Sequence, residues 1–203
     1  CMILFAGVRW YHLAAMARGR GALVGGVLMS GQLQDYQLER LVTFINPASD
    51  PLETGYNVAQ AKIAIGAGGI FGRGLGAGSQ SQLRFLPESQ TDFIFAVIAE
   101  ELGFVGVMVI LAACVLLCVR LLMAARVSRD AFAAYVLIGI FATFFVQAFI
   151  HVGVNLAIIP ATGVTLPLVS YGGSSLIVML TMLGVAESIS SRILPADRLS
   201  RNA

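Results

Sequence analysis

The chain has 203 residues, of which 58% are hydrophobic and only 12% are charged, and its formal net charge at pH 7 is +2. The apolar share is above, and the charged share below, the shares typical of soluble domains, and the mean hydropathy is +0.85. This composition excludes an ordinary soluble domain and indicates a membrane protein.

The beginning of the chain lacks the features of a processed leader. Its first apolar stretch, CMILFAGV, is too short to cross a bilayer that needs roughly 20 residues. We therefore expect the sequence to be a fragment that begins inside a helix. No basic segment, apolar core and small-residue cleavage site follow one another as in a signal peptide, so we expect none.

Two apolar stretches, near 94–119 and 131–150, predict transmembrane helices. The first contains an uninterrupted uncharged run from Leu102 to Val119, and the second is uncharged throughout. The hydrocarbon core of a bilayer is crossed by about 20 apolar residues in helical conformation, with a lower limit of about 17. Each stretch is therefore long enough to span it.

Two further stretches, near 11–33 and 173–191, are interrupted or shorter. Arg18 and Arg20 interrupt the first, which spans only if their side chains reach back to the interface. The second is followed by Pro195, at which we expect its helix to end. Together the four stretches predict an all-α, polytopic membrane protein with a single membrane domain over the whole chain.

The basic residues are divided unequally between the two sides that these helices define. If the stretches alternate across the membrane, one side carries Arg9, Arg18, Arg20, Arg120, Arg126, Arg129, Arg192, Arg198 and Arg201. The other side carries Arg40, Lys62, Arg73 and Arg84. Because positive charge gathers on the cytoplasmic side, we expect the first side to be cytoplasmic. The loops 36–92 and 151–172 then face outward.

The first outward loop is too long to be a passive connector and too apolar to be disordered. Within the first, residues 55–65 combine helix formers with apolar repeats, which predicts a short helix along the membrane surface. The second contains NLAIIPATGVTLPLVSYGGSS, in which Tyr171 is the one ionisable side chain. Such irregular apolar backbone survives at membrane depth only where it packs against protein or lines a cavity.

Asp92 directly precedes the apolar helix near 94–119, and this position allows two interpretations. As an N-cap, its carboxylate would accept hydrogen bonds from backbone N–H groups of the first turn. As a general base at the outer membrane surface, it would take a proton from a substrate, which an apolar wall beside it favours. The interpretations conflict in part, because capping stabilises the ionised form.

Two adjacent glutamates, Glu100 and Glu101, follow inside the same helix. A continuous helix places Glu100 about 12 Å deeper than Asp92, which is too far for a shared proton. Neighbouring helical residues point about 100° apart, so only one glutamate can face a given cavity. We expect at least one of them to contact a buried donor, with Lys62, Arg73 and Arg84 as candidates. Alternatively, both glutamates lie at the interface and the helix proper starts at Leu102.

The glycine-rich segment GAGGIFGRGLGAG is not expected to bind a nucleotide. It matches the G-x-G-x-x-G pattern only if the pattern is stretched, and no strand precedes it in a βαβ unit. Its glycines would let backbone N–H groups approach an anion, to which Arg73 would add charge. A phosphate contact and a flexible outer loop therefore both stay open.

Other polar and sulfur-containing residues lie within or beside the spans. Gln147, His151 and Asn155 follow one another at i, i+4 spacing, which favours hydrogen bonds between helices over catalysis or metal binding. Cys114 and Cys118 share one helix face in hydrocarbon and are expected to be small apolar packing residues.

Two stretches resemble a known family. They are LQDYQLERLVTFINPASDPLETGYNVAQAKIAIGAGGIFGRGLGAGSQSQLRFLPESQTDFIFAVIAEELGFVG and NLAIIPATGVTLPLVSYGGSS. Their combination resembles the C-terminal part of the shape, elongation, division and sporulation (SEDS) peptidoglycan glycosyltransferases, and the resemblance covers nearly everything from Leu33 to Ile193. The segment SQSQLRFLPE is more similar to the rod-shape branch, RodA, than to the division branch, FtsW.

The resemblance implies an inverting glycosyltransferase of the bacterial plasma membrane that polymerises lipid II, the lipid-linked disaccharide-peptide, at the outer face. The Asp of the TDF motif is treated as catalytic in this family, so Asp92 is implied to take the proton of the acceptor sugar's 4-hydroxyl. That hydroxyl attacks the anomeric carbon and expels lipid pyrophosphate, which needs positive charge nearby.

Charge and position give further candidates for binding the substrate or shaping its cavity. The candidates for holding pyrophosphate, with or without a divalent ion such as Mg²⁺ or Mn²⁺, are Lys62, Arg73 and Arg84. Glu88 is expected to support Asp92 or its loop, and Tyr171 and Ser174 to shape the cavity. Glu100 and Glu101 are expected to form a structural or substrate-facing ion pair.

The implied partners are lipid II, the growing glycan strand, membrane lipid and a class B penicillin-binding protein, which crosslinks the polymer; no nucleic acid is expected. Two alternatives stay open, namely a flippase that moves the lipid-linked precursor and a non-catalytic scaffold for the transpeptidase. No inverted repeat is visible between the two halves, and the distinctive residues gather on one face. Both observations favour the enzyme.

Overall fold

A computed structural model describes residues 54–78 and 90–201, with 193–201 described by backbone alone. Within these ranges the chain forms four helices and no strand: α4 (Thr54–Gly68), α6 (Ile94–Val127), α7 (Ala131–Asn155) and α8 (Gly173–Arg201). The all-α class is therefore confirmed. The predictions for the span near 11–33, for loop residues 36–53, and for Arg84 and Glu88 lie outside the described residues.

Three of the helices are long and apolar enough to cross a membrane, namely Ile94–Val127, Ala131–Asn155 and the Gly173–Arg192 part of α8. Each is longer than the uncharged stretch that predicts it. At 1.5 Å per residue, α6 has a contour of about 50 Å, against a hydrocarbon core of about 30 Å. Parts of α6 must therefore lie outside the hydrocarbon.

Helix α8 does not end at Pro195 but continues to Arg201, so that prediction was wrong. A proline inside a helix removes one backbone donor and crowds the carbonyl four residues earlier. Such a residue kinks many helices without terminating them.

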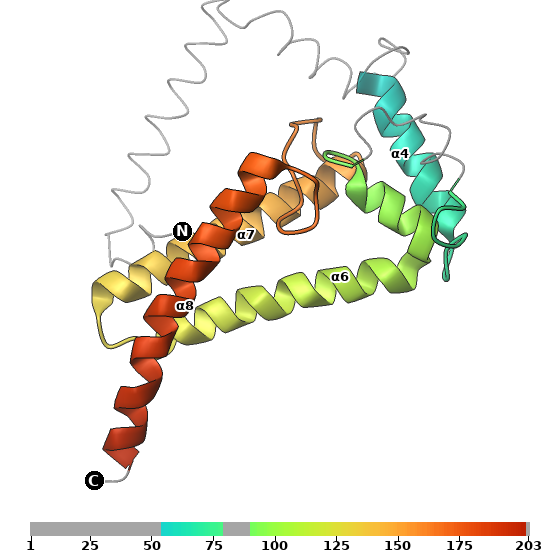
Figure 1. Cartoon of the computed structure of the whole chain (residues 1–203). Helices are drawn as coiled ribbons and strands as arrows, with labels where there is room; N and C mark the ends of the chain where they lie inside the picture. The colour runs from blue at the N-terminus through green and yellow to red at the C-terminus, as the bar shows by residue number, and fades with distance from the viewer. Residues whose placement is uncertain (1–53, 79–89, 202–203) are drawn as a thin grey trace, which may run out of the picture.

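Helices α6 and α7 run in opposite directions and are joined by a tight turn (Figure 1). Asp130 ends this turn as the N-cap of α7, where its carboxylate accepts from Phe132 N at 3.2 Å and from Ala133 N at 3.3 Å. Helix α8 packs against both helices in one apolar core. The buried members of that core are Leu121, Ala125, Leu137, Ile138, Ile140, Phe144, Met179 and Ala186.

Helix α4 packs against the first turns of α6 through small side chains (Figure 1). Ala61 and Ala64 of α4 are fully buried against Phe93 and Ala96. Alanines let two helix backbones approach closely. The predicted helix in the outer loop is thus present, and it covers the start of α6.

A break at Gly103 divides α6 into a short first segment and a long second one (Figure 1). The residue has φ 67° and ψ −166°, a conformation that is essentially restricted to glycine. The loop after α4 supplies hydrogen bonds at the break: Arg73 N and Gly74 N donate to Glu100 O and Glu101 O at 2.9 and 3.0 Å. From the other side, Phe104 N and Val105 N donate to Gly69 O and Ile70 O at 2.9 and 3.1 Å.

Glycines make this pairing of loop and broken helix possible. A Cβ atom at Gly68 would overlap the carbonyl of Ala99, and one at Gly72 would overlap the carbonyl of Glu101. The interpretation of this segment as a flexible outer loop was therefore wrong, because its backbone is bonded into the helix that carries the predicted site.

Candidate active site

The segment that carries Asp92 is held by three successive backbone carbonyls. Tyr171 N donates to Gln90 O at 2.9 Å, and Ser170 Oγ donates to Thr91 O at 2.8 Å. Asn155 Nδ2, from the last residue of α7, donates to Asp92 O at 3.0 Å. The second outer loop and the end of α7 thus fix the backbone just before α6.

Asp92 does not cap α6, so that interpretation was wrong. The helix begins at Ile94, and its N-cap is Phe93, which makes no side-chain cap. The first-turn amide of Ala96 donates to Asn155 Oδ1 at 3.2 Å, a side chain from another helix. The Asp92 carboxylate therefore makes no capping hydrogen bond to the first turn of α6.

The Asp92 side chain is half-buried and faces the second outer loop. A methyl group added at Gly163 would lie 3.4 Å from Asp92 Oδ2, and Gly163 itself has φ +66°. The carboxylate thus lies between the start of α6, the end of α7 and the loop.

The second outer loop is fixed by its own hydroxyl groups. Ser170 Oγ accepts from Leu166 N at 2.8 Å, and the hydroxyls of Thr165 and Ser175 lie 2.8 Å apart, which joins the loop to the start of α8. Leu168 adopts a positive φ of 63°, which is uncommon for a residue with a side chain. The prediction that this apolar backbone packs against protein is confirmed.

Replacing Ser170 with Ala is expected to destabilise the folded state by about 1–3 kcal/mol, the cost of leaving a buried donor without a partner. The donor concerned is Leu166 N–H, in a residue that is almost completely buried. Thermal unfolding in detergent measures the effect. Ser191→Ala is the matched control, because its exposed hydroxyl bonds only to Ser188 O of its own helix; equal melting temperatures for both variants would contradict the prediction.

The other predicted site residues are distributed over several positions. Lys62 is exposed on α4, and Arg73 is exposed in the glycine-rich loop, where its Nε donates to Ala67 O at 3.3 Å. Tyr171 is 82% exposed beside the Asp92 segment, and Ser174 is exposed in the first turn of α8.

The two glutamates differ in burial. Glu100 is fully buried, whereas Glu101 is half-buried, as expected for neighbours that point in different directions. Both glutamates lie in the short first segment of α6, so helix already exists before Leu102, whereas the long second segment begins only after the break at Gly103. Their carbonyls receive the loop's N–H groups, so both belong to the support of the break at Gly103.

The described residues do not form a metal site made of protein ligands alone. Among residues 54–78 and 90–192, no group of three His, Cys, Asp or Glu side chains is placed to hold a metal ion. A divalent cation at this site would need phosphate oxygens of a ligand beside Asp92.

Two features of the site were not found from the sequence. Ser170 joins the loop to Thr91, and Gly163 approaches the carboxylate of Asp92. The signal for Ser170 is a hydroxyl inside an otherwise apolar loop, which must find a partner when buried. Nothing in the sequence pairs Gly163 with Asp92.

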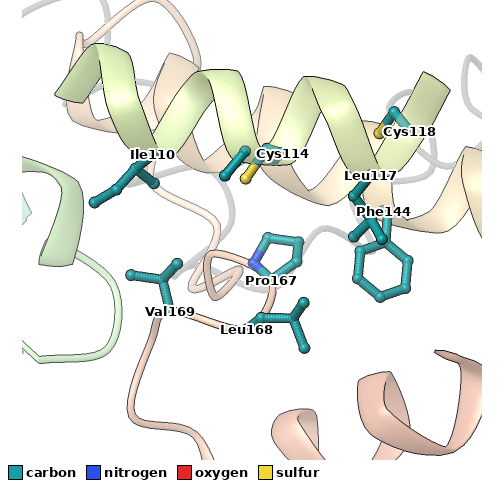
Figure 2. A pocket seen from close by; sticks show the side chains of 10 residues that line it. Ile110, Cys114, Leu117, Cys118, Phe144, Pro167, Leu168 and Val169 are labelled. Atoms are coloured by element: carbon teal, nitrogen blue, oxygen red, sulfur yellow. The ribbon is translucent and has the colours of Figure 1, made fainter. Parts of the chain in front are cut away.

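An apolar crevice of about 260 Å³ lies next to the second outer loop. Figure 2 shows Ile110, Cys114 and Leu117 on the side of α6 that faces Pro167 of the loop. The lining residues are Ile110, Ala113, Cys114, Leu117, Cys118, Phe144, Ala148, Pro167, Leu168 and Val169. The crevice adjoins the loop residues that hold the Asp92 segment.

Comparisons with known proteins agree on one family. The sequence model of a family described as cell cycle protein, FTSW_RODA_SPOVE, matches residues 1–193. Peptidoglycan glycosyltransferase MrdB of Escherichia coli is 44% identical over 188 residues, which cover 93% of this chain and 50% of that protein. Stage V sporulation protein E of Bacillus subtilis is 41% identical over 190 residues, which cover 93% of this chain and 50% of that protein.

A solved structure is also similar to this chain. It is described as structural coordination of polymerization and crosslinking by a peptidoglycan synthase complex. The TM-score is 0.74 at 33% sequence identity, and the match covers 95% of this chain and 52% of that one. This chain spans about half the length of the curated relatives it matches.

Proposed function

Because this chain belongs to the FtsW, RodA and SpoVE family of cell cycle proteins, we propose that it polymerises lipid II into glycan strands at the outer face of the bacterial plasma membrane. One of the curated relatives named above is named a peptidoglycan glycosyltransferase, MrdB. The proposed role of the polymer is in cell elongation and shape. The reaction is an inverting glycosyl transfer.

The observation that carries this proposal is how the backbone and the carboxylate of Asp92 are placed. Its backbone carbonyl is bonded to Asn155, while its carboxylate caps nothing and faces Gly163 of the outer loop. A general base needs an ionised carboxylate that is positioned yet available to a substrate hydroxyl. The bonded backbone of Asp92 and the partial exposure of its side chain support this role.

The proposed step moves one proton and one glycosyl group. Asp92 takes the proton of the acceptor sugar's 4-hydroxyl, whose oxygen forms a bond to the anomeric carbon of the donor. The bond from that carbon to the lipid pyrophosphate breaks on the opposite face, and pyrophosphate leaves with the electron pair. Lys62, Arg73 and Arg84 are proposed to stabilise its charge, which is the function of cations in phosphoryl and pyrophosphate sites.

The outward orientation rests on the distribution of arginines. The Asp92 segment, the end of α7 and the start of α8 meet at one end of the helices, whereas Arg126 and Arg129 lie at the α6–α7 turn at the other (Figure 1). Positive charge gathers on the cytoplasmic side. The end that carries Asp92 is therefore proposed to face outward.

The apolar crevice is proposed to hold hydrocarbon of the lipid-linked donor. It adjoins the loop that holds the Asp92 segment, and ten residues without charge line it. Its volume of about 260 Å³ fits a short part of a polyprenyl chain near the pyrophosphate. Burial of hydrocarbon there would orient the anomeric carbon at the site.

Replacing Ala113 with Phe is expected to lower polymerisation of lipid II by filling the crevice, which Ala113 lines. We expect KM for long-chain lipid II to rise roughly tenfold, because burial of about two methylenes is lost. Ala112→Phe is the matched control, since Ala112 is the neighbouring residue on α6, is exposed like Ala113 and does not line the crevice. Similar KM values for the two variants would show that the crevice does not hold the donor's chain.

A class B penicillin-binding protein is the proposed partner. The similar solved structure is described as a complex that coordinates polymerization and crosslinking. The apolar surfaces of α6 and α7 offer large exposed side chains for contacts within the membrane, among them Phe104, Phe145 and Phe149.

The test of the proposed function uses the full-length protein with its transpeptidase partner in liposomes that contain fluorescent lipid II. We expect glycan polymer of increasing length, measured by gel electrophoresis. Movement of lipid II between the leaflets without polymer would instead establish the flippase alternative. Crosslinking by the partner that depends on this protein, again without polymer, would establish the scaffold.

A further inference from the structure

We propose that the last turn of α7, through Asn155 and His151, positions the carboxylate of Asp92 for the reaction. This inference rests on the proposed function, because it assigns positioning residues to the same site. Both side chains are buried, with exposures of 0% for Asn155 and 1% for His151. Their i, i+4 spacing places them on one face of α7.

Asn155 joins the end of α7 to the start of α6 through its side-chain amide, which makes three hydrogen bonds. Its Nδ2 donates to Asp92 O at 3.0 Å and to His151 O at 2.9 Å, and its Oδ1 accepts from Ala96 N at 3.2 Å. Carbonyls only accept and amides only donate, so these partners fix the orientation of the side-chain amide. A leucine could make none of these bonds, and an aspartate could make only the one to Ala96.

His151 holds the loop on the other side of the same carboxylate. Its Nδ1 lies 2.8 Å from Val164 O, and a carbonyl only accepts, so Nδ1 carries the hydrogen. Val164 directly follows Gly163, the residue that approaches Asp92 Oδ2. The bond from His151 therefore sets the distance between the loop and the carboxylate.

The second ring nitrogen of His151, Nε2, is in a different environment from Nδ1. His151 Nε2 is buried and has no hydrogen-bond partner in the part of the chain that the structure describes. If His151 acted as a base, Nε2 would be the atom that takes a proton. The contact to Val164 alone requires only the donor at Nδ1, so the two roles can be separated by substitution.

The two side chains act on different parts of the site around Asp92, and both come from the last turn of α7. Asn155 fixes the backbone from which the side chain extends, and His151 fixes the wall that the side chain faces. A displacement of about 1 Å at a reacting group can lower a rate by roughly 100-fold. Loss of either contact is therefore expected to lower kcat more than it raises KM, since both side chains are almost completely buried.

The test compares His151→Asn, His151→Leu and Asn155→Leu in the polymerisation assay, with the full-length protein and its partner. The amide nitrogen of asparagine can occupy the position of Nδ1, but nothing replaces Nε2. We expect His151→Asn to retain kcat within about threefold, and His151→Leu and Asn155→Leu to lose at least tenfold with KM little changed. Thr143→Ala on α7 is the control, because its hydroxyl bonds only to Gly139 O.

The outcomes separate the inference from the proposed function. Polymer from the wild type with equal kcat from both leucine variants overturns the positioning role, and equal loss in His151→Asn and His151→Leu makes His151 a base. No polymer from the wild type refutes the proposed function instead. Amide hydrogen exchange gives a readout without activity. Ala96 N donates to Phe93 O at 3.0 Å as well as to Asn155 Oδ1, and Val97 N donates to Phe93 O at 3.2 Å. Asn155→Leu should therefore speed exchange at both amides relative to Thr143→Ala by freeing the whole start of α6, and unchanged exchange at both would overturn the anchoring of this segment.

Discussion

Alanine in place of Gly103 is expected to destabilise the protein by at least about 3 kcal/mol. Two costs add at this position. The backbone has φ 67° and ψ −166°, a region that costs a residue with a side chain about 1–3 kcal/mol. The added Cβ would also overlap Gly72 N and crowd the carbonyl of Ile70, which the structure can relieve only by moving the loop.

The melting temperature in detergent and the fraction of monodisperse protein measure this effect. Gly66→Ala is the matched control, because Gly66 lies inside α4 with no atom within 4 Å of an added Cβ. Alanine there should be neutral or stabilising by about 0.5–1 kcal/mol, since glycine is a poor helix former. Comparable melting temperatures for the two variants would mean that the break in α6 does not depend on Gly103.

The sequence predicts the helices well because their signal is local. Uncharged apolar runs of about 20 residues have few alternatives to a membrane helix, and α6 and α7 lie where such runs occur. The predicted ends of the helices were less accurate, for a physical reason. Charge marks where hydrocarbon ends, whereas a helix continues until its backbone turns, as α8 does beyond Pro195.

The site was predictable in its central residue and not in its supports. Asp92 stands out because a carboxylate adjoins an apolar helix, but the sequence does not show that a different residue starts the helix. Asn155 bonds to Asp92 across 63 positions of the chain, and no periodicity fixes the register between such distant segments. The glycine-rich loop presents the same difficulty, because its role depends on a break that one glycine permits inside an apolar run.

Asparagine in place of Asp92 is expected to lower the rate of polymerisation by at least about 100-fold, the usual minimum contribution of a general base. In this structure the substitution changes little besides the carboxylate. The contact to Asn155 uses the backbone carbonyl of Asp92, and the side chain caps no helix. Asparagine has nearly the same shape, so it removes the proton acceptor and leaves the segment in place.

Asp130→Asn provides a matched control for this change. Asp130 caps α7 at the opposite end of the helices, and asparagine caps a helix about as well as aspartate. Its activity should therefore equal that of the wild type. Both variants should also keep the melting temperature of the wild type within a few degrees, which excludes misfolding as the cause of lost activity.

The most direct test of the account is the initial rate of glycan polymer formation from lipid II by Asp92→Asn, compared with the wild type and Asp130→Asn at equal amounts of folded protein. The account predicts polymer from the wild type and Asp130→Asn and at least about 100-fold less from Asp92→Asn. Equal rates from all three proteins would contradict it, because the carboxylate of Asp92 would then not be the base of the reaction.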